Sequence, residues 1–176
     1  QNNIDKNYII FVSSKQLIAN DHKVNNIKTL PAVASLNFIY LKYNKSLTND
    51  WSCIFHDTVW LRPIIAEKDK TIKVDFHVLN GTASFNIFED NNEKLCVQGY
   101  VSCKDENNIH PKPINFLNKR TNYLNKNDIY TIFNNQNITY GPYFKVIEEV
   151  WYGEGEVLGR IKLPSEFMHE LKELPY

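Results

Sequence analysis

One helical run that is apolar on almost every side most constrains what this chain can fold into. It starts at Pro31, a residue that suits a first helical turn because its missing N–H would have no partner there. Apolar residues follow at helical spacing: Ala32, Val33, Leu36, Ile39, Tyr40 and Tyr43. They cover much of the circumference, so we expect a buried helix with another part of the chain around it.

The segments on either side of this helix have the pattern of strands. Residues 8–12, YIIFV, form a β-branched and aromatic run, and a polar loop follows them. After the helix come SCIFHDTVWLRPIIA, TIKVDFHVL, TASFNIFE and LCVQGYVSC, with turns predicted at Asn80-Gly81 and at 90–93. The pattern predicts an α+β fold, a long helix against an antiparallel sheet. The aromatic residues expected in the core of the sheet are Trp60, Phe76, Phe85 and Phe88.

The second half of the chain starts like the first but supplies fewer strands. Residues 105–125 contain two prolines and few periodic apolar positions, which indicates a linker. A short helix follows, with Asn127-Asp128 as the predicted cap, and then two strands around Gly153-Glu154-Gly155. The predicted organisation is therefore a first unit at 1–104, a linker at 105–125 and the truncated start of a second unit at 126–176.

Composition excludes several classes of protein. Twenty Lys and Arg balance twenty Asp and Glu, which argues against a nucleic-acid or membrane-surface partner. The three cysteines form no C-x-x-C pair, and His56, Asp57 and His77 lack the spacing of metal ligands, so no metal is expected. Without a signal peptide or a run of about 20 apolar residues, we expect a cytoplasmic protein.

His22 is the residue best suited to chemistry. An imidazole has an ordinary pKa of ~6.5, which suits proton abstraction near neutral pH. His22 lies shortly before the N-terminus of the predicted helix, where free N–H groups stabilise developing negative charge. Removal of a proton next to a carbonyl needs such a base beside such an anion site. A loop histidine with no chemical role is the alternative.

Three motifs in a fixed order give the chain a family resemblance. HKVNNIKTLP, from His22 to Pro31, follows the pattern H-x-x-x-G-x-x-x-x-P and has Asp21 in front of it. NITYGPYF at 137–144 resembles G-Y-x-Y-G-P-x-F, and GEVLGRIKLP follows at 155–164. Together with DTVWLRPI and CVQGYVS between them, these motifs resemble a dehydratase domain of a modular polyketide synthase, from about Tyr8 to Pro164.

The resemblance implies a fold and a reaction. The fold would be a hot-dog fold, the first unit of a double hot-dog plus an incomplete second unit. His22 would abstract the α-proton of a β-hydroxyacyl thioester, and a carboxylic acid would protonate the departing hydroxyl, leaving an α,β-unsaturated thioester. The substrate-binding residues that it implies are Val24, Leu30, Pro31, Ala32, Val33, Tyr140, Gly141, Pro142 and Phe144. Among them, the N–H groups near Ala32 and Val33 would polarise the thioester carbonyl.

The resemblance also implies partners. The substrate would arrive on the phosphopantetheine arm of an acyl carrier protein, and the domain would bind no cofactor of its own. Neighbouring domains of a megasynthase and a second copy in a homodimer would complete the assembly.

The chain departs from the family pattern at several positions. Asn26 stands where the first motif has glycine, Ala32 replaces a glycine after Leu-Pro, and Asn137-Ile138 replace Gly-Tyr. The family's acid is an aspartate after the L-x-L-P strand, and residues 165–176 contain no aspartate. Two alternatives therefore stand beside the dehydratase: a double-bond isomerase or pyran-forming cyclase, and a non-catalytic scaffold that docks a carrier protein.

Overall fold

The computed structural model describes residues 4–44, 51–79, 82–89, 94–105 and 122–165. Contacts within the chain divide it into two compact units. The first unit comprises residues 1–19 and 29–110, and the second comprises residues 20–28 and 111–176. The short segment 20–28 therefore belongs with the C-terminal part of the chain, although residues of the first unit flank it on both sides in the sequence.

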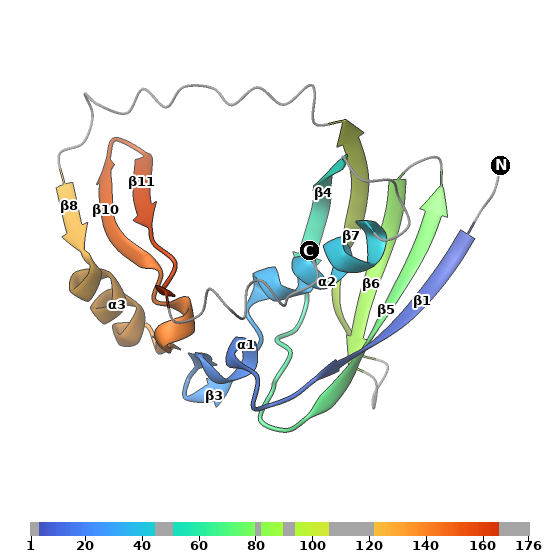
Figure 1. The fold of residues 1–176 in the computed structure, drawn as a ribbon, viewed down its shortest axis with the longest axis horizontal. Helices are drawn as coiled ribbons and strands as arrows, with labels where there is room; N and C mark the ends of the chain where they lie inside the picture. Colours follow the sequence, from blue (N-terminus) through green and yellow to red (C-terminus); the bar gives the residue numbers. More distant parts are fainter. Residues whose placement is uncertain (1–3, 45–50, 80–81, 90–93, 106–121, 166–176) are drawn as a thin grey trace. The chain divides into compact units, whose positions relative to one another are not determined.

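The first unit is built on a five-stranded antiparallel sheet with the order β1-β5-β6-β7-β4 (Figure 1). Its strands are β1 (Ile4–Val12), β4 (Trp51–Trp60), β5 (Lys70–Leu79), β6 (Thr82–Glu89) and β7 (Lys94–Asp105). The predicted strands are confirmed. The turns predicted at 80–81 and 90–93 lie outside the described residues, but the strands that flank them pair as hairpins do, Leu79 with Thr82 and Glu89 with Lys94.

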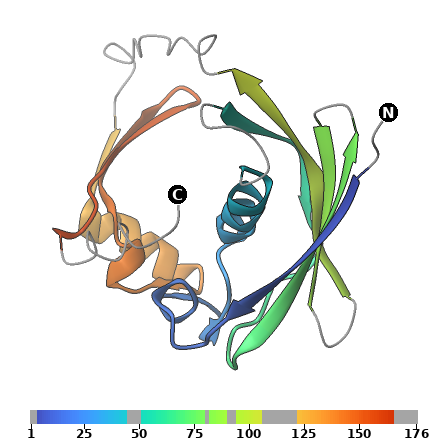
Figure 2. The same ribbon diagram turned by 45° about the vertical axis from the view of Figure 1, so that its right-hand side comes forward.

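Helix α2 (Ala32–Asn44) confirms the helix predicted after Pro31. It lies on one face of the five-stranded sheet, as Figure 2 shows. Ile39 and Tyr43 are buried in the same cluster as the inward side chains of the sheet, and the Tyr43 ring stacks on Phe76 with 6.1 Å between centroids. The predicted α+β layer of a buried helix against an antiparallel sheet is thus the core of this unit.

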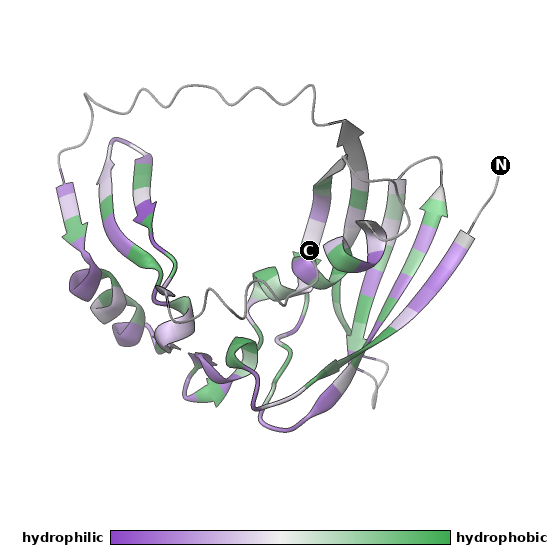
Figure 3. Cartoon of the chain, viewed as in Figure 1, coloured by the Kyte–Doolittle hydropathy of each residue, from purple (hydrophilic) through white to green (hydrophobic). Residues whose placement is uncertain are grey.

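The inward face of the sheet follows the period of two that strands impose. Every second residue from Ile72 to Phe76 in β5 and from Ala83 to Ile87 in β6 is buried, and bands of apolar and polar residues alternate along these strands in Figure 3. The buried side chains are Ile72, Val74, Phe76, Ala83, Phe85 and Ile87. The core positions predicted for Phe76 and Phe85 are confirmed, whereas Phe88 is only partly buried.

The core position predicted for Trp60 is wrong, because 43% of this residue is exposed. Strand β4 changes register between His56 and Val59, so the alternation of faces at its start does not continue to its end. The indole N–H of Trp60 instead donates to the Ala32 carbonyl at 3.0 Å and to the Ser35 hydroxyl at 3.1 Å. Trp60 therefore binds the first turn of α2 from an exposed position at the end of β4.

The second unit contains the short helix and the strand pair that the sequence predicts. Its elements are β8 (Asn122–Asn125), α3 (Lys126–Asn135), β9 (Ile138–Tyr140), η2 (Pro142–Phe144), β10 (Ile147–Gly153) and β11 (Glu156–Ile161). Strands β11, β10 and β8 form one antiparallel sheet. Glu154 and Gly155 have φ of 44° and 80° in the tight turn between β10 and β11, which suits the predicted turn.

The cap of α3 lies two residues before the predicted one. Asn125 accepts the N–H groups of Asn127 and Asp128 at 2.9 and 3.1 Å, and the Asp128 carboxylate accepts the Asn125 N–H. This is a reciprocal capping box. Of the predicted linker, residues 106–121 lie outside the described residues and 122–125 form β8; residues 166–176 also lie outside.

The loop predicted between the first strand and α2 is wrong in part, because it contains a short helix and two short strands. They are α1 (Leu17–Asn20), β2 (His22–Val24) and β3 (Ile27–Lys28). Asn25 and Asn26 form the turn between β2 and β3 with φ of 51° and 64°. On its other side β2 pairs with β9, more than a hundred residues away in the sequence, and no local pattern announces such a pairing.

Candidate functional site

The pairing of β2 with β9 brings the two main sequence motifs together around His22. His22 lies directly opposite Tyr140 in this antiparallel ladder. His22 is only 9% exposed, and the centroid of its imidazole lies 5.4 Å from that of the Tyr140 ring and 6.2 Å from that of the Phe144 ring. A histidine of the first motif thus lies in an aromatic wall made by the second. Its predicted role as a base stays a prediction.

Two asparagines that stand where the family pattern has glycine have a left-handed backbone. Asn26 has a φ of 64° and Asn137 a φ of 60°, both in the left-handed region. Asparagine enters this region more readily than most other residues. The Asn25 N–H also donates to the Asn137 carbonyl at 2.8 Å, so the two turns are joined directly. Asparagine at these two positions is therefore compatible with the turns that the chain makes there.

A buried carboxylate connects the same two motifs from the side. Asp21 is 7% exposed, and its Oδ2 accepts the Tyr143 N–H at 2.9 Å. Its backbone carbonyl accepts the Gly141 N–H at 2.7 Å, and Asn20 Nδ2 donates to Oδ1 at 3.3 Å. Asp21 directly precedes His22 in the first motif, and no role was predicted for it. That adjacency to the motif histidine was its one signal in the sequence.

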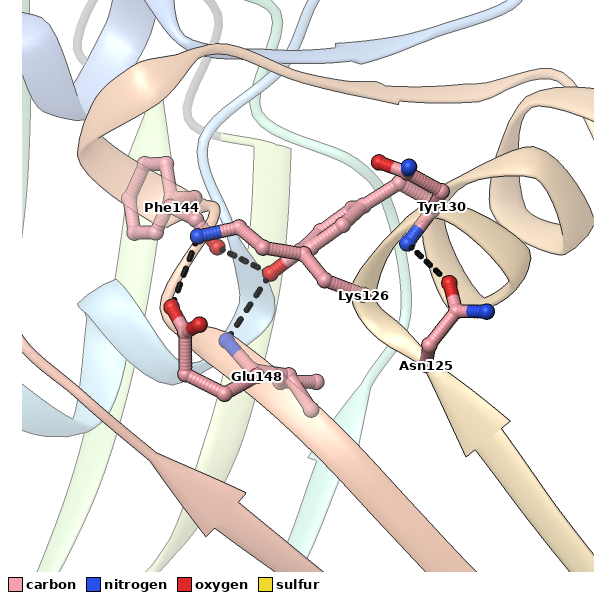
Figure 4. Close-up of polar contacts among 7 residues, drawn as sticks. Asn125, Lys126, Tyr130, Phe144 and Glu148 are labelled. Carbon is pink, nitrogen blue, oxygen red and sulfur yellow. Dashed lines mark hydrogen bonds and ion pairs between the residues drawn. The ribbon is translucent and has the colours of Figure 1, made fainter.

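Tyr130 holds the other end of the same turn (Figure 4). Its hydroxyl donates to the Phe144 carbonyl at 3.1 Å and accepts the Ile147 N–H at 3.0 Å. Burial raises the pKa of this phenol, so the hydroxyl keeps the proton that it donates. The ion pair between Lys126 and Glu148, 2.8 Å long, lies beside it and joins α3 to β10. Helix α3 thereby fixes the backbone that carries Phe144.

Removing the Tyr130 hydroxyl is expected to loosen this arrangement. Tyr130→Phe should lower the free energy of unfolding by about 1–3 kcal/mol, because two backbone groups lose their partner in a largely buried place. Urea denaturation measures the change. Tyr123→Phe is the matched control: the Tyr123 hydroxyl contacts Glu149 at 3.4 Å from an exposed side chain, and its loss should cost about 0.5 kcal/mol or less. Equal costs for the two variants would contradict the assignment.

Tyr140 presents a protonated phenol beside the imidazole. Burial raises the pKa of Tyr140, so its hydroxyl remains a hydrogen-bond donor at neutral pH. Gly141 follows as the first residue of the turn and Pro142 begins η2. Val24 is half-buried on β2, opposite Ile138 of β9. These predicted substrate-binding residues of the second unit therefore lie in the ladder of β2 and β9 or directly after it.

The other predicted substrate-binding residues belong to the first unit. Leu30 and Pro31 are buried there, and the Leu30 N–H donates to the Ile64 carbonyl at 2.9 Å. Ala32 and Val33 are exposed in the first turn of α2, with Val33 65% exposed. The prediction that these four residues bind the same substrate as the second unit's residues stays a prediction.

Two histidines outside this site, His56 and His77, have partners of other kinds. His77 pairs with Asp5 at 2.5 Å, and His56 contacts the Ser102 hydroxyl at 2.9 Å. Among the residues that the structure describes, no three His, Cys, Asp or Glu side chains gather closely enough to hold a metal ion. Within the same residues, no helix has the length and apolar character needed to cross a bilayer.

The chain thus combines a buried helix on an antiparallel sheet with a motif histidine in an aromatic wall. The known proteins that are similar to it are polyketide synthases and their dehydratase domains. A family model described as "Polyketide synthase dehydratase N-terminal domain" matches residues 119–176. The polyketide synthases PksN and PksM of Bacillus subtilis (strain 168) are each 27% identical over 165 residues. The matches cover 87% and 85% of this chain but only 3% and 4% of these much longer relatives.

Solved dehydratase structures share the fold. The dehydratase domain of a trans-AT polyketide synthase from Brevibacillus brevis superposes with a TM-score of 0.84 at 20% identity, covering 96% of this chain and 67% of that one. The dehydratase domain from the CurF module of the curacin polyketide synthase also superposes with a TM-score of 0.84, at 19% identity. This match covers 96% of this chain and 64% of the CurF chain. The predicted resemblance is therefore confirmed: the chain is similar to polyketide synthase dehydratase domains and shares the hot-dog fold of the solved ones.

Proposed function

We propose that this chain is part of a dehydratase, a lyase that removes water from a β-hydroxyacyl thioester and leaves an α,β-unsaturated thioester. The observation that carries the proposal is the pairing of β2 with β9, which sets His22 against Tyr140 and Phe144. The similarity to dehydratase domains of polyketide synthases supports it.

In this reaction His22 takes the proton from the carbon between the thioester carbonyl and the hydroxyl-bearing carbon. The aromatic wall excludes water from the imidazole and limits its orientation. The Tyr140 phenol, protonated at neutral pH, donates a hydrogen bond to the substrate hydroxyl. The N–H groups of Ala32 and Val33 polarise the carbonyl, as the family resemblance implies.

The departing hydroxyl also needs a proton, and this chain's residues are not assigned that task. Two inactive mutants of the CurK dehydratase, one with a histidine replaced by phenylalanine and one with an aspartate replaced by asparagine, are among the similar structures. They support a reaction that uses both a histidine and an aspartate. Both structures are longer than this chain, which covers 63% and 64% of them.

The proposal includes the delivery of the substrate. The acyl chain arrives on the phosphopantetheine arm of an acyl carrier protein, so the domain needs no cofactor of its own. The matched relatives are very large polyketide synthases, which supports neighbouring domains in the same assembly. A homodimer and a cytoplasmic location complete the proposal.

The isomerase or cyclase alternative has lost one of its motivations. It rested in part on Asn26 in place of the motif glycine, and Asn26 adopts the positive φ that glycine would supply. We therefore place dehydration first.

A turnover assay tests the choice between these reactions. The complete polypeptide that carries this chain is incubated with β-hydroxyacyl thioesters of N-acetylcysteamine of several chain lengths, and products are followed by mass spectrometry and ultraviolet absorbance. Loss of one water with a new conjugated chromophore is the expected result. A product of unchanged mass would indicate isomerisation or cyclisation. No turnover, together with binding of an acyl carrier protein, would indicate the scaffold.

A further inference from the structure

Asp21 is a buried acid for which the proposed reaction has no use. We infer that Asp21 is a positioning residue, which holds the turn from Tyr140 to Phe144 against His22. The inference rests on the proposed function of His22 as the base. The residues that it concerns, Asp21, His22, Tyr130 and 140–144, belong to the second unit and lie within the described parts of the chain.

Asp21 makes two hydrogen bonds to this turn. Its carbonyl accepts the Gly141 N–H at 2.7 Å, and its carboxylate accepts the Tyr143 N–H at 2.9 Å. One residue thus holds the turn at two points that lie on either side of Pro142. The bond to the Tyr143 N–H joins residues 122 positions apart in the sequence, so it ties the turn directly to the residue beside His22.

The turn also lies very close to the Asp21 side chain at Gly141. A Cβ placed on Gly141 would lie 2.2 Å from the Asp21 Cγ and 2.5 Å from each carboxylate oxygen. Gly141 has a φ of −81°, which any residue can adopt, so glycine is required here for space and not for its backbone freedom. The turn therefore packs directly on the carboxylate.

These contacts have a consequence for the imidazole. Tyr140 and Phe144, whose rings contact His22, are the residues immediately before and at the end of this turn. Their backbone is tied to β2 through Asp21 and to α3 through Tyr130. Without the carboxylate the turn keeps the Tyr130 contact and the bond from the Gly141 N–H to the Asp21 carbonyl, but loses the bond at Tyr143. Phe144, the next residue, would then be held less firmly against the imidazole, while substrate binding elsewhere stays unchanged.

Turnover by variants of the complete polypeptide tests this role. Asp21→Ala should lower kcat for dehydration by about 10- to 100-fold with KM within about threefold, because misplacing a catalytic group acts on the chemical step. Asp21→Asn retains an oxygen that can accept the Tyr143 N–H and should recover most of the loss. Asp69→Ala is the control, since Asp69 accepts the Ser14 N–H at 2.7 Å in the first unit, and kcat should stay within about twofold. An unchanged kcat in folded Asp21→Ala would overturn the inference.

A second measurement works without turnover. The Tyr140 and Phe144 rings lie close enough to His22 to shift the magnetic resonance signals of its imidazole protons. In Asp21→Ala these ring-current shifts should shrink, while Asp69→Ala should leave them as in the wild type. Unaltered shifts in Asp21→Ala would overturn the inference. An inactive wild type whose shifts respond as expected would instead refute the proposed function and leave the positioning role standing.

The steric contact allows a double substitution that does not depend on one variant folding. Gly141→Ala alone should lower the melting temperature because its methyl group collides with the carboxylate. Combined with Asp21→Ala, which removes that carboxylate, the same change should cost less than it does in the wild type. Additive losses would show that the contact has no energetic weight and would contradict the inference.

Discussion

Replacing His22 with alanine is expected to reduce kcat/KM for dehydration by about 10²- to 10⁴-fold, the range that a positioned acid–base group contributes. The imidazole lies at the junction of β2 and β9, and histidine is the residue type whose ordinary pKa suits proton removal near neutral pH. The assay is the conversion of a β-hydroxyacyl thioester by the complete polypeptide, followed at substrate concentrations well below KM.

Two further variants separate chemistry from packing. His22→Phe keeps a ring against Tyr140 and Phe144 but has no basic nitrogen, so it should be as inactive as His22→Ala. His77→Ala removes a half-exposed histidine that pairs with Asp5 on the sheet of the first unit, and its activity should match the wild type. Turnover by His22→Phe at near the wild-type rate would show that His22 supports the site only by its shape.

Replacing Phe85 with alanine is expected to lower the free energy of unfolding by about 3–5 kcal/mol. Phe85 is 1% exposed in the middle of β6 and meets Phe55 edge to face with 6.3 Å between centroids. A Cβ on Gly99, its partner in β7, would lie 2.8 Å from the tip of its ring, so the ring fills space that a neighbouring side chain would otherwise take. The truncation therefore leaves a cavity at the centre of the sheet.

Urea unfolding measures this cost, with Phe11→Ala as the matched control. Phe11 lies on β1 of the same sheet but is 61% exposed, so the same truncation there should cost less than about 1 kcal/mol. The comparison holds where circular dichroism and tryptophan fluorescence give coincident transitions. Equal losses in the two variants would show that Phe85 does not hold the core together.

Much of the first unit could be predicted from local patterns. The helix after Pro31 and the strands of the sheet each carry their own periodicity, and the structure places them where that periodicity indicates. The error at Trp60 arose because the register of β4 changes within the strand, which alternation along the sequence does not reveal. The cap of α3 was misplaced by two residues because Asn125, Asn127 and Asp128 are all residue types that cap helices and lie within four positions.

The candidate site was also predicted only in part. His22 and the Tyr140-Gly141-Pro142 step were predicted from their motifs, and the structure brings them together. The strand β2 and the contacts of Asp21 were missed, since the three-residue strand has no pattern of its own. Asp21 and Tyr143 are 122 residues apart in the sequence.

The sequence by itself determined most of the helices and strands and the family resemblance, because periodicity, turn residues and motif order are properties of short segments. It placed a histidine near a helix start and Asn26 where the family pattern has glycine. The tertiary structure alone decided that β2 pairs with β9 and that a buried carboxylate holds the turn beside the histidine. The physical reason is that such contacts form only when burial and hydrogen bonding outweigh the entropy of closing a loop of more than a hundred residues, a balance that belongs to the whole fold.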